Sequence, residues 1–486
     1  MKKMKEKSLI KNALFNVSYK LLSVLFPLIT ISYASRILGA SGIGTISSAQ
    51  NLVTYFSTIA ALGIPSYGVR AISQNRKNEN NKNKTFSELF TINFVMSIID
   101  FICYVLFIFG TSQQNMLLSL VFSSIVFLNI FNIEWLYQGM EEYVYIAIRS
   151  FIIKIISVVL LFIFVKDIYD IEIYALIICF GTIGNYILNV LNLKKYVKFT
   201  LKGLDIKKHI KPILIFFASV IAIELYSLLD ITMLTRMATS EAVGYYNNAV
   251  KIIKTIANSV TAFGAVLLPR LSMHYADKNI SQIKKELTRF LKIITTLTFP
   301  AVIGILLTSK EIVLILFGKE FLPATDTLKI LAPLIILMPL SGGIFGQLLL
   351  TTGKEKKYLV CVCLGAFINC ILNYILIKKY LQNGAALASV ITEFCVTLLM
   401  IKMSRQDVKL DFEIKHYIKV ILASFSMFIP CIIISLLNLH IGTIGIFMLK
   451  LILSILLYFI LLYFFKNEVV IIIMEKVKGK VKCQKK

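Results

Sequence analysis

The sequence predicts an all-α polytopic membrane protein of about 14 transmembrane helices. The 486 residues are 57% hydrophobic with a mean hydropathy of +0.80, and this leaves too little polar surface to cover a soluble domain. Apolar stretches of membrane-spanning length recur along the whole chain. The basic residues that separate them lie in short segments. Together these observations favour one helical membrane bundle.

Each predicted span is a stretch long enough to cross the hydrocarbon, which takes about 20 helical residues. No alternating segments flanked by two-residue turns predict a strand. The fourteen stretches that qualify are 13–35, 43–68, 86–109, 115–137, 143–165, 171–193, 212–235, 242–268, 290–308, 324–351, 357–377, 384–401, 418–437 and 442–465.

The distribution of basic residues predicts the orientation of these spans. With the N-terminus inside, 39 of the 52 lysines and arginines lie in inside segments, seven in outside loops and six in spans. Arg149 is counted here as a residue of the inside segment 138–149. A bias of this size follows the positive-inside rule. An even number of spans then places both termini in the cytoplasm, and the basic start leads into an uncleaved first span.

The stretch 236–269 resembles the stretch 36–65 and is a candidate second copy of it. Aligned without gaps, the arginines that open the two copies coincide, and Gly44 meets Gly244. Both copies follow an apolar span and precede a basic loop, so they suggest the duplicated unit that is typical of secondary transporters. The alternative is that such turns recur between spans by chance.

The long inside segment 194–211 separates spans 1–6 from spans 7–12, and these two sets of spans are nearly equal in length. A second inside segment carries an amphipathic helix with Ile280, Ile283, Leu287, Phe290 and Leu291 on one face, as expected for an interfacial helix. The predicted organisation is an N-terminal lobe 1–193 with spans 1–6, a cytoplasmic linker 194–211, a C-terminal lobe 212–403 with spans 7–12, spans 13–14 in 404–465, and a basic cytoplasmic tail 466–486.

Several kinds of chemistry have no residues to support them. No phosphate-binding P-loop occurs, and the four histidines are isolated, so neither a nucleotide cofactor nor a metal site is predicted. The net charge of +26 lies in loops between spans, which indicates membrane orientation and not nucleic-acid binding. No outside loop is long enough for a typical membrane enzyme. Coupling to protons or to sodium stays open.

Ionisable residues in and beside the spans are the candidate cavity residues, because charges at membrane depth are costly and usually face a cavity or each other. Lys251 and Lys254 share a helix face, and Lys254 is placed at the depth of Glu224. We expect Glu224 and Lys254 to pair and Lys251 to contact a diphosphate or an acidic sugar. Structural ion pairing is the alternative for all of them. The candidate substrate-binding residues are Lys20, Arg36, Glu224, Asp230, Arg236, Lys251 and Lys254.

Several motifs, in this order along the chain, resemble one known family. They are Leu25–Thr30 with Ser35–Gly39, Leu62–Arg70, Glu134–Glu141, Ser227–Asp230, Val243–Tyr246, Leu267–Arg270 and Thr352–Tyr358. The chain resembles Wzx-type oligosaccharide flippases of the multidrug/oligosaccharidyl-lipid/polysaccharide exporter superfamily. The resemblance covers spans 1–12 and assigns no role to spans 13 and 14.

The resemblance implies two six-helix lobes around a central cavity that opens alternately to the two sides of a bacterial cytoplasmic membrane. It implies an undecaprenyl-diphosphate-linked oligosaccharide as substrate, membrane lipids as surroundings, and a role in capsule or O-antigen synthesis beside a polymerase and chain-length machinery. Lysines where lipid II flippases keep cavity arginines argue against a peptidoglycan precursor. A multidrug exporter of the same superfamily and a membrane glycosyltransferase or polymerase are the alternatives.

Overall fold

The computed structural model is helical throughout the residues that it describes. These are 9–111, 115–200, 203–264, 271, 273–275, 277, 279–405, 413–437 and 441–471, without the side chains of 9–25, 219 and 262–264. No strand occurs among them. The chain forms two compact units, Met1–Gly244 and Tyr245–Lys486. The division into lobes 1–193 and 212–403 stays a prediction.

The first unit contains the helices up to the start of α9. They are α1 (Leu9–Ala61), α2 (Ile64–Asn75), α3 (Glu79–Gly110), α4 (Met116–Leu128), η1 (Asn129–Phe131), α5 (Glu134–Gly139), α6 (Tyr143–Phe164), α7 (Ile171–Asn192), η2 (Leu193–Lys195) and α8 (Lys207–Met237).

Helix α9 passes from the first unit into the second, which holds the remaining helices. They are α9 (Ser240–Gly264), α11 (Ile280–Leu316), η3 (Lys319–Phe321), α12 (Ala324–Leu331), α13 (Leu334–Met338), the π-helix η4 (Pro339–Phe345), α14 (Gly346–Thr351), α15 (Glu355–Ser404), α16 (Ile414–Phe425), α17 (Phe428–Leu436) and α18 (Thr443–Phe464).

Eleven helical stretches of the described chain are long and apolar enough to cross a membrane. Two of them, Phe26–Asn75 and Glu355–Ser404, have 50 residues each and contain a backbone break. Each therefore accounts for two of the predicted spans. Helix α9, which contains Lys251, Lys254 and three asparagines, is not among these stretches. Its crossing of the membrane stays a prediction.

The two breaks fall where the sequence predicts turns. In α1 the break is at Gly39, with φ 68° and ψ −179°, a conformation that glycine adopts without a side-chain clash. In α15 it is at Leu381, with φ 49° and ψ −128°, where no glycine relieves the strain. The predicted pairs of spans 1–2 and 11–12 are thus confirmed as separate helical segments.

The basic segment 69–84, which lies between the predicted spans 43–68 and 86–109, is largely helical. Helix α2 runs to Asn75, and α3 begins at Glu79 after the side chain of Asn78 accepts a hydrogen bond of 3.1 Å from the Asn81 amide. The predicted second span is also divided, because Leu62 and Gly63 have positive φ. A basic, polar composition indicates that a segment lies outside the hydrocarbon. It does not distinguish a loop from a helix whose end is capped by a polar side chain.

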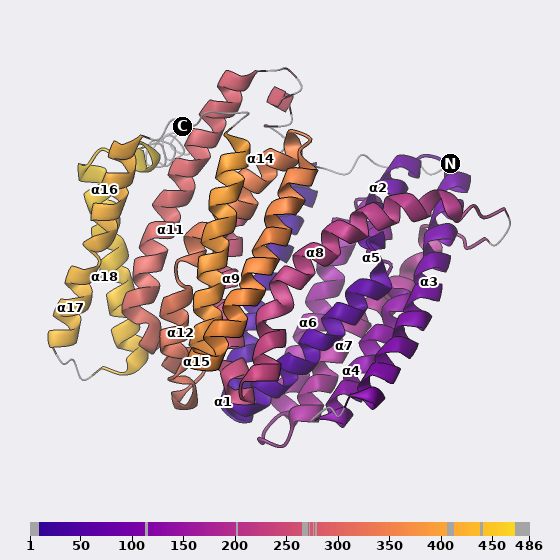
Figure 1. Ribbon diagram of the computed structural model, residues 1–486, viewed down its shortest axis with the longest axis horizontal. Helices are drawn as coiled ribbons and strands as arrows, with labels where there is room; N and C mark the ends of the chain where they lie inside the picture. Colours follow the sequence, from indigo (N-terminus) through magenta and orange to yellow (C-terminus); the bar gives the residue numbers. More distant parts are fainter. Residues whose placement is uncertain are drawn as a thin grey trace, which may run out of the picture. The chain divides into compact units, whose positions relative to one another are not determined.

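In the first unit, α3, α4, α6 and α7 form a bundle, with α4 packed on α3 and α7, and α6 on α7 (Figure 1). Helix α8 lies along α1 and α2. The segment before α8 is fastened to α3 by Glu88, which is fully buried. Its carboxylate accepts hydrogen bonds from the Asp205 amide at 2.8 Å and from Lys208 Nζ at 3.0 Å, and it contacts His209 Nε2 at 2.8 Å.

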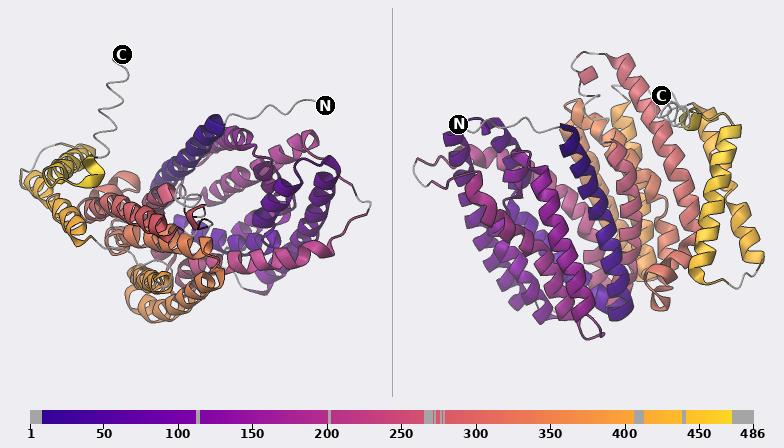
Figure 2. Two further views of the ribbon diagram at one scale, coloured as in Figure 1. Left: turned by 90° about the horizontal axis from the view of Figure 1, so that it is seen from above. Right: turned by 180° about the vertical axis from the view of Figure 1, so that it is seen from behind.

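In the second unit, α16 and α18 pack against α11, and α17 packs against α18 (Figure 2). Lys450 of α18 pairs with Glu311 of α11 at 2.7 Å. Beyond α18, the ammonium of Lys292 donates to Glu468 at 2.8 Å and holds the pKa of that carboxyl below its usual range. The two C-terminal helices are therefore fixed to α11 at several levels.

The expected interfacial helix is the beginning of α11 and not a separate element. Ile283, Leu287, Phe290 and Leu291 are buried by the rest of the second unit, whereas Ile280 is exposed. The apolar face is thus covered by protein and not by a lipid surface. Amphipathicity shows that one face is buried, but it does not show what covers that face.

Candidate functional site

The second half of α1, between Gly39 and Ala61, carries polar side chains at membrane depth. Many are serines and threonines whose hydroxyls donate to the carbonyl one turn earlier, as Ser48 does to Gly44 at 3.0 Å and Thr54 to Gln50 at 2.7 Å. Such bonds satisfy a hydroxyl inside an apolar bundle. The helix can therefore carry polar residues here without destabilising it strongly.

The polar residues fall on two opposite faces of this helix. Thr45, Ser48, Asn51 and Tyr55 line one cavity, and Gln50, Thr54, Ser57 and Thr58 line another. Spacings of three and four residues keep each set on one face. The two cavities are named here after one residue of each, the Arg236 cavity and the Asn129 cavity.

The Arg236 cavity has a volume of about 670 Å³ and lies between α1, α3, α4, α8 and the start of α9. Hydroxyl and amide groups dominate its lining, and Arg236 is the charged residue among the described residues that border it. Hydrogen bonds join its walls: Ser48 Oγ lies 2.8 Å from Thr235 Oγ1, and Asn51 Nδ2 donates to Thr232 Oγ1 at 2.7 Å. The Oδ1 atom of Asn51 is buried and has no described partner.

Beside this cavity, α1 and the start of α9 touch through two glycines. A Cβ atom on Gly44 would lie 1.7 Å from the carbonyl oxygen of Ser240. A Cβ atom on Gly244 would lie 2.2 Å from the carbonyl oxygen of Ala40. Gly44 and Gly244 are the residues that the sequence alignment of the two copies superposes, so equivalent positions of the repeat make reciprocal contacts.

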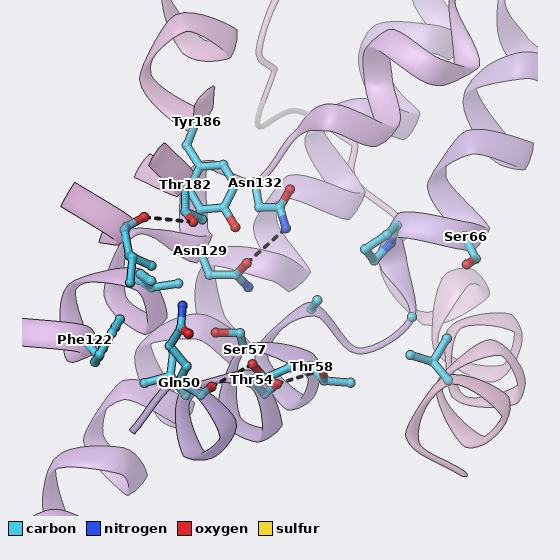
Figure 3. A pocket seen from close by; sticks show the side chains of 17 residues that line it. Gln50, Thr54, Ser57, Thr58, Ser66, Phe122, Asn129, Asn132, Thr182 and Tyr186 are labelled. Carbon is cyan, nitrogen blue, oxygen red and sulfur yellow. Dashed lines mark hydrogen bonds between the residues drawn. The ribbon is translucent and has the colours of Figure 1, made fainter. Parts of the chain in front are cut away.

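The Asn129 cavity has a volume of about 410 Å³ and is bordered by residues of α1, α2, α4, η1, α7 and α8 (Figure 3). Among the described residues that line it, none carries a formal charge. Phe122 and Tyr186 add aromatic surface. The hydrogen-bonding side chains are Gln50, Thr54, Ser57, Thr58, Ser66, Asn129, Asn132, Thr182 and Tyr186.

A buried ion pair close to Tyr186 supports the wall of this cavity. Arg149 is 2% exposed and donates to Glu134 Oε2 at 2.6 Å, and it also donates to Asn189 Oδ1. Gln138 Nε2 donates to the second carboxylate oxygen at 3.1 Å. Arg149 lies within α6, which begins at Tyr143 and agrees with the predicted span 143–165; the charge count had assigned this residue to the inside segment 138–149. The apolar residues on both sides of Arg149 in the sequence were the signal that could have placed it within a helix.

Asp100 of α3 is a second buried charge carrier in this unit. It is 4% exposed, and its Oδ2 atom has no hydrogen-bond partner among the described residues. A buried carboxyl oxygen that makes no hydrogen bond is costly in free energy. The sequence identifies Asp100 as a residue within a span but gives no indication of its isolation.

The seven sequence-predicted residues are distributed over both units. Arg236 lines the Arg236 cavity and is exposed, and Arg36 is also exposed. Asp230 is buried and Glu224 half-buried on α8.

The three predicted lysines are not among the residues that line the two cavities. Lys251 and Lys254 are half-buried on α9 in the second unit, and the side chain of Lys20 lies outside the described residues. The pairing of Glu224 with Lys254 stays a prediction. The sequence interpretation missed the neutral residues of both cavities, because it used charge at membrane depth as its marker. The three- and four-residue spacing of polar groups in 45–58 was the signal that could have found them.

The fold is that of a polytopic helical membrane protein with polar cavities in its first unit. The structure is similar to the solved structure described as "Lipid II flippase MurJ, inward closed conformation", with a TM-score of 0.74 and 17% identity, covering 95% of this chain and 100% of that one. That similarity shows the fold. The enzyme alternative has no support in this comparison.

Curated relatives extend the similarity along most of the chain. A protein of Shigella dysenteriae named "Putative O-antigen transporter" is 24% identical over 393 residues, which is 78% of this chain and 95% of that protein. One of the same name from Escherichia coli strain K12 is 23% identical over 411 residues, 82% of this chain and 97% of that protein.

The family model described as "Polysaccharide biosynthesis protein" matches residues 9–274, which is more than half of the 486 residues. The chain therefore belongs to the polysaccharide biosynthesis protein family. The resemblance to Wzx-type flippases of the multidrug/oligosaccharidyl-lipid/polysaccharide exporter superfamily is confirmed.

Proposed function

We propose that the protein is a flippase that moves undecaprenyl-diphosphate-linked oligosaccharide repeat units from the inner to the outer leaflet of a bacterial cytoplasmic membrane. The units would supply O-antigen, capsule or a related surface polysaccharide. Movement would occur by alternating access, with both termini in the cytoplasm. A polymerase and chain-length machinery would act on the product.

The observation that carries this proposal is the lining of the two cavities in the first unit. Hydroxyls and amides at membrane depth offer both donors and acceptors, which is what a carbohydrate requires. Arg236 supplies a cation for an anionic group at one of them. Family membership and the names of the relatives point to the same substrate class.

A multidrug exporter is the second candidate. A cavity for cationic compounds needs carboxylates in its lining, but no Asp or Glu is among the described residues that line either cavity. The lining therefore favours a carbohydrate over a cationic drug.

The decisive experiment is deletion of the gene with analysis of lipid-linked intermediates. Loss of a flippase should abolish the surface polysaccharide while complete repeat units accumulate on the inner leaflet. If the repeat units are not made, the protein acts in their synthesis and the proposal fails. Cytoplasmic signals from reporters fused after Lys84, Lys202 and Lys409 would test the orientation, and a periplasmic signal at any of them would contradict it.

A further inference from the structure

Two hydrogen-bonding groups in the wall of the Asn129 cavity have no hydrogen-bond partner among the residues that the structure describes. Asn129 is 1% exposed, and its Nδ2 atom has no hydrogen bond to a described residue, although its Oδ1 atom accepts from Asn132 Nδ2 at 3.1 Å. The Oγ atom of Ser57 is likewise buried and unpartnered. Figure 3 shows the Asn129 amide and the side chains of Ser57 and Gln50 directed towards one space. Unmet polar groups are costly when buried, so this space is suited to a polar occupant.

Hydrogen bonds from neighbouring residues hold both the backbone and the side chain of Asn129 in place. Its backbone carbonyl accepts a hydrogen bond of 2.9 Å from Asn93 Nδ2, and Asn93 itself is 2% exposed on α3. With Oδ1 held by Asn132, the Nδ2 donors are the groups that remain available. The site is therefore built before any ligand binds.

The electrostatics of the cavity exclude most charged occupants. Its described lining contains no charged residue, and the nearby Arg149 and Glu134 neutralise each other at 2.6 Å. An anion here would lack a compensating cation at membrane depth, and a cation would lack a carboxylate. An alkyl chain would leave the amide and the hydroxyl unsatisfied. The remaining class is a neutral molecule with many hydroxyls.

We propose that the Asn129 cavity binds a neutral sugar residue of the transported oligosaccharide, separately from its diphosphate. The inference rests on the proposed function and specifies a subsite for it. Sugar hydroxyls both donate and accept, so one ring can satisfy Asn129 and Ser57 together. Tyr186 and Phe122 provide aromatic surface for the apolar faces of the ring. The volume of about 410 Å³ falls within the usual range for small-molecule sites.

Saturation-transfer NMR on the full-length protein in lipid nanodiscs tests this directly. The probes are a neutral methyl hexoside, glucose 1-phosphate and glucuronic acid, each in the absence of alkyl-glycoside detergent. We expect saturation transfer to the neutral glycoside, and much weaker transfer to the two anions. In Asn129→Leu and in Ser57→Ala the affinity for the neutral glycoside should fall about fivefold or more, the loss expected for one hydrogen bond to a buried group.

The matched control is Ser124→Ala on α4, the helix that leads into η1, since Ser124 donates to the Val121 carbonyl and is not among the residues that line the cavity. It should bind as the wild type does. Ser57→Ala removes one oxygen atom only, so it keeps the test valid if Asn129→Leu does not fold. Absence of transfer to the neutral glycoside, equal binding by Ser57→Ala, or equal transfer to the anions would overturn the proposal and leave the cavity as a site for water.

Binding is measured without transport, so this result is independent of the deletion experiment. A protein that binds the glycoside but whose loss does not cause repeat units to accumulate would contradict the flippase function alone. Accumulation without glycoside binding would contradict the subsite alone.

Discussion

Replacing either glycine of the reciprocal contact should destabilise the first unit. The Cβ atom of Gly44→Ala would meet the Ser240 carbonyl oxygen at 1.7 Å, and that of Gly244→Ala would meet the Ala40 carbonyl oxygen at 2.2 Å. Ordinary contacts of a Cβ atom begin at 3.4 Å. The obstructing atoms belong to the backbone, so no side-chain rotation removes either overlap.

The extent of the two Cβ–carbonyl overlaps determines how much stability each substitution should cost. Relief requires the two helices to move apart by on the order of 1–2 Å, because each Cβ must reach ordinary contact distance. Overpacking of a well-packed contact costs about 1–3 kcal/mol, and we expect Gly44→Ala at the upper end since its overlap is larger. The double substitution should cost less than the sum, because the first methyl group already separates the helices for the second.

Thermal melting of the purified protein, followed by size-exclusion chromatography after heating, measures this order. The expected ranking of melting temperatures is wild type, then Gly244→Ala, then Gly44→Ala. The control is Gly304→Ala in α11, where the added Cβ would meet only Met427 Cε at 3.8 Å. It should melt at or above the wild-type temperature. A Gly44→Ala protein that melts like Gly304→Ala would refute the close contact.

Three further predictions concern charged residues within the helices. Arg149→Met leaves Glu134 without its partner and should cost about 3 kcal/mol, which Glu134→Gln in the same chain should partly restore; equal melting temperatures of the single and double variants would contradict the pair. Asp100→Asn should leave the melting temperature unchanged, because a protonated carboxyl and an amide have nearly the same shape; a large decrease would mean that the carboxylate is ionised and paired. Lys251→Ala should keep protein abundance and reduce polysaccharide export; normal export at wild-type abundance would remove its proposed role.

The positions of the helices could largely be predicted from sequence, because hydrocarbon thickness fixes their length and charge fixes the loops. The break at Gly39 follows from a glycine in a short polar turn. The break at Leu381 could be placed within a turn, but not at a leucine, because its positive φ is imposed by the surrounding structure. Tertiary context also decides that the start of α11 is covered by protein.

The site was harder to predict than the fold for a physical reason. A charge at membrane depth stands out in a sequence, and this led to Asp230 and Arg236. Neutral polar residues such as Gln50 and Ser57 are compatible with an ordinary helix interface, since serine and threonine satisfy their own hydroxyls on the helix backbone. Whether they face a neighbour or a cavity depends on packing. The repeat likewise predicts that Gly44 and Gly244 are equivalent, but equivalence does not imply that they touch.

The second half of α1 links these observations, because it is the common wall of both cavities. Its ends are marked by positive φ at Gly39 and at Leu62 and Gly63, so the straight segment lies between two backbone breaks. The glycine contact holds this segment near its first end. A displacement that enlarges the Arg236 cavity would move the same helix towards the Asn129 cavity on its opposite face. Gly44→Ala therefore tests more than stability: an altered position of α1 should change glycoside binding at Asn129, although that residue lies on η1 and does not contact the glycine pair.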